Sequence, residues 1–102
     1  FTVAKTLESN PFILEMTFPE PRMLSGFSLA IGTANVQITL KCYIEEGLKP
    51  IVYRFEGRGT EDQPELSFDL PAPTQIQVLR VEVLDPFSPE QAKVHIWELK
   101  LR

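Results

Sequence analysis

Cysteine, histidine and tryptophan each occur once in the 102 residues. The single cysteine, Cys42, cannot form a disulfide within the chain. A nucleophilic cysteine needs a histidine beside it, and His95 falls in another predicted strand with no Asn or Asp apparent to orient it. Cys42 instead shares the parity of Val36, Ile38 and Leu40. We therefore expect a buried, inert Cys42 and a protein without enzymatic activity.

An excess of positive charge and a long apolar run are also missing. The formal net charge is -4 and the pI is about 4.9, with Lys and Arg scattered along the chain. Binding to a nucleic-acid backbone needs a basic face, so we expect no nucleic-acid partner. No apolar segment approaches the roughly 20 residues that cross a bilayer, so we expect no membrane insertion by this domain.

The chain does contain short segments in which apolar and polar residues alternate. The length suits one domain, residues 1–102, and the start at Phe1 rather than Met suggests a piece excised from a larger protein. Alternation at every second residue indicates half-buried strands. The residues expected to face inward are Phe1 and Val3; Phe12, Leu14, Met16 and Phe18; Phe27, Leu29 and Ile31; Val36, Ile38, Leu40, Cys42 and Ile44; Ile51, Tyr53 and Phe55; and Leu66, Phe68 and Leu70.

The segment Gln75–Leu84 is the strand around which we expect the others to be arranged. Leu79, Val81 and Val83 alternate with the charged Arg80 and Glu82. Ile76 and Val78 have the opposite parity to the first three. The strand therefore either buries both faces at its start or contains a one-residue bulge near Val78.

Proline and glycine divide the remainder of the chain. We expect Leu7–Asn10 to be a loop, the prolines of 19–21 and of 71–73 to end strands, and Gly57–Pro64 to be a polar loop. Residues 85–93 are expected to form an irregular connection with one helical turn from Ser88. Seven or eight short strands separated in this way predict an all-β antiparallel sandwich or jelly roll, with a closed barrel as the alternative.

Three segments resemble the galactose-binding-like, or discoidin-type, jelly rolls of coagulation-factor C domains and bacterial carbohydrate-binding modules. They are Phe12–Leu29 with its proline turn, Val78–Asp85 with its arginine, and Val94–Leu101 with a glutamate after an apolar pair. The resemblance implies a galactose-binding-domain-like fold, carbohydrate binding, and an extracellular or cell-surface location. It also implies Glu98 as a candidate calcium ligand. The companion Asp-Gly loop of the family is missing before Pro11, so we expect neither a metal nor another cofactor.

Any ligand site is expected on loops at one end of the sandwich. Sugar recognition needs an aromatic face with planar hydrogen-bonding groups, and Tyr53 beside Arg54 and Arg58 provides both. The predicted ligand-binding residues are Tyr53, Arg54, Arg58, Glu61, Asp62 and Phe87. The carboxylates Glu45, Glu46, Glu61 and Asp62 could in principle pair as acid and base, but solvated loop charge is the preferred interpretation. The Trp97 side chain is expected to cover the hydrophobic core or a surface between domains.

These expectations are compatible with two functions. In the first, the domain is a non-catalytic accessory module that binds carbohydrate weakly. In the second, it is a structural or protein–protein interaction domain of a larger multidomain protein, with no small-molecule ligand.

Overall fold

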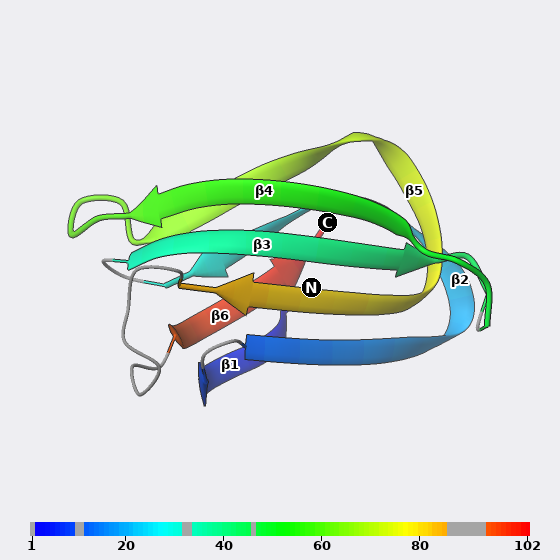
Figure 1. The fold of residues 1–102 in the computed structure, drawn as a ribbon, viewed down its shortest axis with the longest axis horizontal. Helices are drawn as coiled ribbons and strands as arrows, with labels where there is room; N and C mark the ends of the chain where they lie inside the picture. Colours follow the sequence, from blue (N-terminus) through cyan, green and yellow to red (C-terminus); the bar gives the residue numbers. More distant parts are fainter. Residues whose placement is uncertain (1, 10–11, 32–33, 46, 86–93) are drawn as a thin grey trace.

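The computed structural model describes residues 2–9, 12–31, 34–45, 47–85 and 94–102, and for 2–9, 34 and 94–97 it describes the backbone alone. All regular structure in these ranges is β-strand, as the alternation predicts. The strands are β1 (Thr2–Ser9), β2 (Phe12–Ala30), β3 (Ala34–Tyr43), β4 (Ile51–Gly59), β5 (Glu65–Leu84) and β6 (Val94–Leu101). They form one antiparallel sheet in the order β1-β6-β2-β5-β3-β4 (Figure 1).

The two long strands β2 and β5 pair with each other in three successive ladders. Phe12–Thr17 pairs with Val78–Val83, Arg22–Leu24 with Thr74–Ile76, and Gly26–Ala30 with Glu65–Asp69. Between these ladders the register shifts twice, once on each strand. The prolines of 19–21 and 71–73 lie in the unpaired residues, where a missing N–H removes no ladder hydrogen bond. The prediction that these prolines end strands is wrong, because both strands continue through them.

The shifts divide the sheet into two halves that fold over one another (Figure 1). The β3–β4 half contains β3, β4, residues 12–17 of β2 and 78–84 of β5. The β1–β6 half contains β1, β6, residues 26–30 of β2 and 65–69 of β5. Phe55 of the first half lies 5.3 and 5.1 Å, centroid to centroid, from Phe27 and Phe68 of the second. The fold is therefore all-β and sandwich-like, with the core between the halves.

Most of the expected inward residues do form this core. The buried members are Phe12, Phe27, Leu29, Ile31, Val36, Ile38, Leu40, Cys42, Leu70, Leu79, Val81 and Val83, and the partly buried ones are Leu14, Met16, Phe18, Tyr53, Phe55, Leu66 and Phe68. The prediction that Ile44 and Ile51 face inward is wrong, since 44% and 41% of their surfaces are exposed. Both lie next to the β3–β4 connection, beyond the end of the core.

The parity change in β5 coincides with one of the register shifts. Ile76 belongs to the core cluster, as do Leu79 and Val81, but Val78 does not. Val78 is nevertheless only 6% exposed, opposite Thr17 on β2 and Tyr43 on β3. The first alternative therefore holds, since β5 buries residues of both parities here. The extra residues at this shift, 18–21, belong to β2 and not to β5.

Several predicted boundaries need correction. Leu7–Ser9 continues β1 rather than forming a loop, because these residues pair with β6. Gly57–Gly59 continues β4, which leaves 60–64 as the loop. Phe1, Phe87 and the helical turn expected from Ser88 lie outside the described residues, and the side chain of Val3 is not described either. The described part of the chain includes no helix that could span a membrane.

Candidate functional site

The outer face of the β3–β4 half carries cross-strand rows of polar side chains. One row is formed by Glu15 on β2, Arg80 on β5 and Lys41 on β3, which are directly opposite one another. The adjacent row is formed by Thr17, Val78 and Tyr43 on the same strands. Since opposite residues of an antiparallel pair project on the same side, each row is a continuous surface across β2, β5 and β3.

Four charged side chains on this outer face form a connected network. Arg80 Nε donates to Glu82 Oε2 at 2.8 Å, and Lys41 Nζ lies 3.1 Å from the same oxygen. Arg80 Nη1 also lies 3.7 Å from Glu15 Oε2. The hydrogen bond from Arg80, together with that from Lys41, lowers the pKa of the Glu82 carboxyl. The same bond to Glu82 raises the pKa of Arg80. The network holds these charges in place across the middle of the face.

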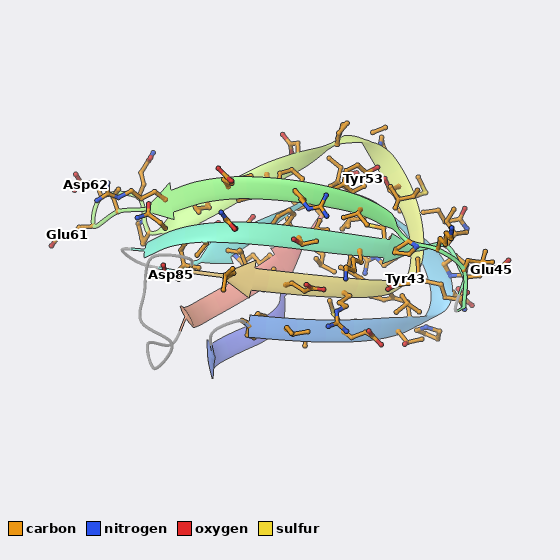
Figure 2. All side chains as sticks on the ribbon, viewed as in Figure 1. Tyr43, Glu45, Tyr53, Glu61, Asp62 and Asp85 are labelled. Atoms are coloured by element: carbon orange, nitrogen blue, oxygen red, sulfur yellow. The ribbon has the colours of Figure 1, made fainter. Side chains whose placement is uncertain are left out.

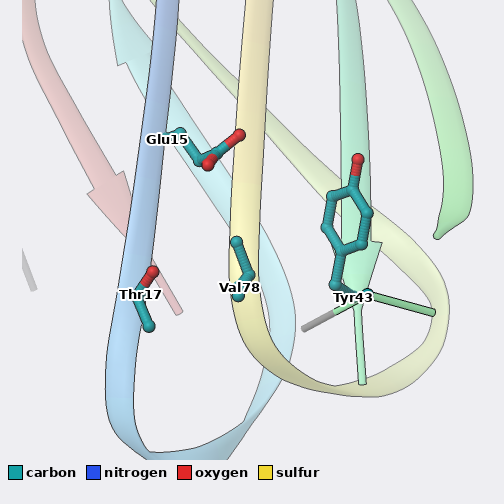
Figure 3. A pocket seen from close by; sticks show the side chains of 5 residues that line it. Glu15, Thr17, Tyr43 and Val78 are labelled. Carbon is teal, nitrogen blue, oxygen red and sulfur yellow. The ribbon is translucent and has the colours of Figure 1, made fainter. Parts of the chain in front are cut away.

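A small hollow lies beside the network, at the end of the face nearest the β3–β4 connection. Its volume is about 180 Å³, and it is lined by Glu15, Thr17, Tyr43, Gly47 and Val78 (Figure 3). The Tyr43 hydroxyl points along β3 toward the level of Glu15 (Figure 3). Gly47 has a φ of 88°, a left-handed conformation that glycine adopts without strain. It belongs to the connection that closes this end of the hollow.

The hollow is lined by a small number of side chains, and these differ in their chemistry. The nearly buried Val78 gives it an apolar floor, and Tyr43 supplies an aromatic ring. Thr17 offers a hydroxyl and Glu15 a carboxylate. Drug-sized ligands occupy roughly 300–1,000 Å³, so this space suits one small ring or group.

The structure does not bring the predicted ligand-binding residues together. Tyr53 faces inward, and its hydroxyl lies 2.8 Å from Thr74 Oγ1, which donates to the Ala72 carbonyl. Because the Thr74 proton is thus used, Tyr53 is the donor. Arg54 and Arg58 project from the other face of β4 and are exposed. The aromatic ring and the guanidinium groups of the expected cluster are therefore separated by the strand itself.

The remaining predicted site residues lie elsewhere. Glu61 and Asp62 are exposed in the β4–β5 loop, at the opposite end of the molecule from Glu45 (Figure 2). Glu45 therefore cannot pair with either as acid and base. Glu46 and Phe87 lie outside the described residues. Ligand binding by these loops stays a prediction, but Glu61 and Asp62 lie away from Tyr53 (Figure 2).

The residues of the hollow were not identified from the sequence. The alternation that points Leu14 and Met16 inward leaves Glu15 and Thr17 on the solvent side of their strand, without marking a site there. The one available signal was Val78, an apolar residue with the parity of the wet face. Its neighbours Thr17 and Tyr43 lie 61 and 35 positions away in the chain, so only the strand order reveals them.

Glu98 and Cys42 have ordinary structural surroundings. The Glu98 side chain is 31% exposed, and its Oε1 lies 3.1 Å from Lys100 Nζ. Within the described ranges, no group of three or more His, Cys, Asp or Glu side chains is placed to hold a metal ion. Cys42 is fully buried, as predicted, and burial raises the pKa of its thiol to about 11. The thiol is therefore protonated at neutral pH. The side chains of His95 and Trp97 are not described.

The sequence matches no family model, and no curated protein is significantly similar to it. The likeness to galactose-binding-like domains thus depends on the three segments quoted above. In the structure these segments lie in β2, β5 and β6, and β2 is the neighbour of both others in the sheet. The three segments are distant in sequence but lie on neighbouring strands. This shows that they belong to one sheet, and it does not show the galactose-binding-like fold.

Proposed function

We propose that this domain is a non-catalytic accessory module that binds one sugar residue weakly in the hollow between Glu15, Thr17 and Tyr43. We further propose that its sandwich-like fold is a jelly roll of the galactose-binding-like type. The observation that carries the first proposal is the placement of an aromatic ring beside hydrogen-bonding groups over an apolar floor. This combination matches a sugar ring, which has apolar C–H faces and a rim of hydroxyls.

The charges around the hollow favour a neutral sugar. The Glu15 carboxylate accepts hydrogen bonds from hydroxyl groups, and the Thr17 hydroxyl both donates and accepts. Arg80 and Lys41 are engaged with Glu82, so neither is left as a dedicated partner for an acidic sugar. A carboxylate in the ligand would also be repelled by Glu15. Affinity from so few contacts is expected on the order of 0.1–1 mM.

The test is an NMR titration of labelled protein with a panel of neutral and acidic oligosaccharides. We expect amide shifts centred on Glu15, Thr17, Tyr43 and Val78, with a neutral sugar. Tyr43→Ala and Thr17→Val should abolish these shifts. Thr39→Val provides the matched control, because Thr39 lies on the same outer face opposite Glu82, outside the hollow.

Other outcomes would locate the function elsewhere. Shifts confined to Arg54, Arg58, Glu61 and Asp62 would support the loop site predicted from the sequence instead of the hollow. Shifts at neither place, with every sugar at millimolar concentration, would contradict carbohydrate binding.

A structural or protein–protein interaction domain is the second candidate, and a specific feature favours it. Ile44, Leu48 and Ile51 are 44%, 54% and 41% exposed within eight consecutive residues at the β3–β4 connection. Apolar side chains gathered at one end of a domain are typical of contacts with a neighbouring domain or protein. This candidate predicts that sugars leave the spectrum unchanged.

A further inference from the structure

β4 is an edge strand whose outer side has no strand paired to it in the described part of the chain. An edge strand presents a row of unpaired N–H and C=O groups, which can pair with another chain. Proteins usually block such edges with charged side chains, a proline, a bulge or an inward-facing charge, and charges block an edge only where they meet like charges on the approaching strand. β4 contains no proline, and its pairing with β3 continues without a register shift from Cys42↔Ile51 to Ala34↔Gly59. By contrast, the pairing of the other edge strand, β1, is interrupted between Thr2 and Ala4.

The charges on β4 differ from those on the central strands. Arg54, Glu56 and Arg58 alternate in sign along its outer face, and all three are exposed. Their opposite residues on β3 are Thr39, Gln37 and Asn35, none of which carries a charge. Across the described ranges, no ion pair involves any of the three, whereas Glu15, Lys41, Arg80 and Glu82 are all paired.

We propose that the β4 edge pairs antiparallel with the β4 edge of a second copy of this chain, with Phe55 at the two-fold axis. This register brings all nine residues of Ile51–Gly59 opposite the same strand of the second copy, because Phe55 is its midpoint. It places Arg54 opposite Glu56 of the second copy, and Glu56 opposite its Arg54. Two ion pairs form at once, since a two-fold contact repeats each pair. The register of maximal pairing is thus also the register of charge complementarity.

Such a contact is small, so the dimer is weak. One strand pair buries less than the roughly 1,200 Å² of a standard interface, and we expect a dissociation constant on the order of 0.1–1 mM. The ion pairs are exposed to solvent, and salt therefore weakens the dimer. The contact leaves the hollow open, because the hollow lies over β2, β5 and β3. The inference is independent of the proposed function.

Charge reversal tests the register through sedimentation of the whole 102-residue chain over a concentration series up to about 1 mM. Arg54→Glu brings like charges together in both pairs, and so does Glu56→Arg. We expect each variant to dimerise at least about tenfold more weakly than the wild type. Both side chains are exposed, and circular dichroism should show an unchanged fold.

Mixing the two variants provides the decisive measurement. The R54E chain is negative at both positions 54 and 56, whereas the E56R chain is positive at both. In a heterodimer of the two, each of these positions is opposite a charge of the other sign, so both pairs are again attractive. We expect the mixture to associate about as tightly as the wild type, detected by fluorescence polarisation of one labelled variant. The double variant R54E/E56R should likewise dimerise by itself.

Arg58→Glu is the matched control. In the proposed register Arg58 is opposite Val52 of the second copy, and reversing its charge should change the dissociation constant by less than about twofold. Disruption by Arg58→Glu equal to that by Arg54→Glu would overturn the register. A wild-type chain that stays monomeric throughout the series, or a mixture no tighter than either variant alone, would overturn the proposal itself.

Discussion

The two faces of the β3–β4 half are formed by the same strands but differ in their side chains and in what these contribute to stability. Toward the interior, Leu79, Val81 and Val83 have no exposed surface. On the outer face, the residues between them, Arg80 and Glu82, form ion pairs in contact with solvent. Burying one such apolar side chain contributes about 1.5–3 kcal/mol, whereas an exposed ion pair contributes about 0–1 kcal/mol. Stability therefore comes mainly from the inner face, and the outer face contributes little to it.

The largest expected effect is at Val81. Val81→Asp would put a carboxylate without a partner among fully buried apolar residues, at a cost of several kcal/mol. We expect this variant not to fold. Glu82→Lys changes the adjacent residue on the outer face and should cost at most about 1 kcal/mol. Urea denaturation followed by circular dichroism compares the two, and equal midpoints would show that the assignment of faces is wrong.

The inner face is also the part that the sequence predicts best. Alternation identifies Leu79, Val81 and Val83 because the side chains of a strand change face at every residue. The same rule fails at Ile44 and Ile51, where alternation continues past the end of the core. A pattern within one strand records which residues share a side, but it contains no information about where the opposite layer ends.

The prolines and the hollow show two other limits of prediction. Proline was expected to end β2 and β5, since it cannot donate to a ladder. In a bent strand that passes from one half to the other, a few residues are unpaired in any case, and proline fits there. The hollow depends on β5 lying between β2 and β3, an order that comes from long-range pairing. The hydroxyl of Tyr53 has a partner, Thr74, that alternation alone does not reveal.

We expect an intermediate loss of stability on substitution of Gly26. Gly26 lies on the outer face of the β1–β6 half, so this position is an outer one that does not tolerate a larger side chain. A Cβ atom on Gly26 would collide with the Phe68 carbonyl oxygen and lie 2.8 Å from Arg102 Nη2. That arginine group donates to the same carbonyl at 2.8 Å. Because backbone must shift to relieve the collision, Gly26→Ala should cost about 1–3 kcal/mol.

Gly47→Ala is the comparison for Gly26→Ala. Apart from its chain neighbours, no described residue has an atom within 4 Å of a Cβ added to Gly47, so the positive φ of 88° is the feature that opposes the change. The expected cost is about 1–2 kcal/mol, from conformation alone. Thermal melts of both variants would separate crowding from conformational strain. A Gly26→Ala variant as stable as the wild type would contradict the close approach of β2 and β5.

The smallest expected effect concerns the pH dependence of the Glu82 network. Hydrogen bonds from Arg80 and Lys41 lower the pKa of Glu82 in the folded state below its ordinary value of 4.5. For a carboxyl whose pKa falls on folding, the stabilisation is fully present above the unfolded pKa and is lost as the pH falls through the folded value. Glu82→Gln should therefore destabilise the domain at pH 7 by up to about 1 kcal/mol, a limit set by partial exposure to solvent. This difference from the wild type should shrink toward low pH.

Glu56→Gln is the control for that pH dependence. Glu56 lies on the same outer face, and within the described residues no ion pair involves it. Urea unfolding of the wild type and both variants, in steps from pH 7 down to about pH 2, measures the two differences. We expect a pH-dependent difference for Glu82→Gln and a small, nearly constant one for Glu56→Gln. The samples must be dilute, because Glu56 also takes part in the proposed pairing of β4 edges. If the two variants behaved alike at every pH, the network would hold its charges in place without stabilising the fold.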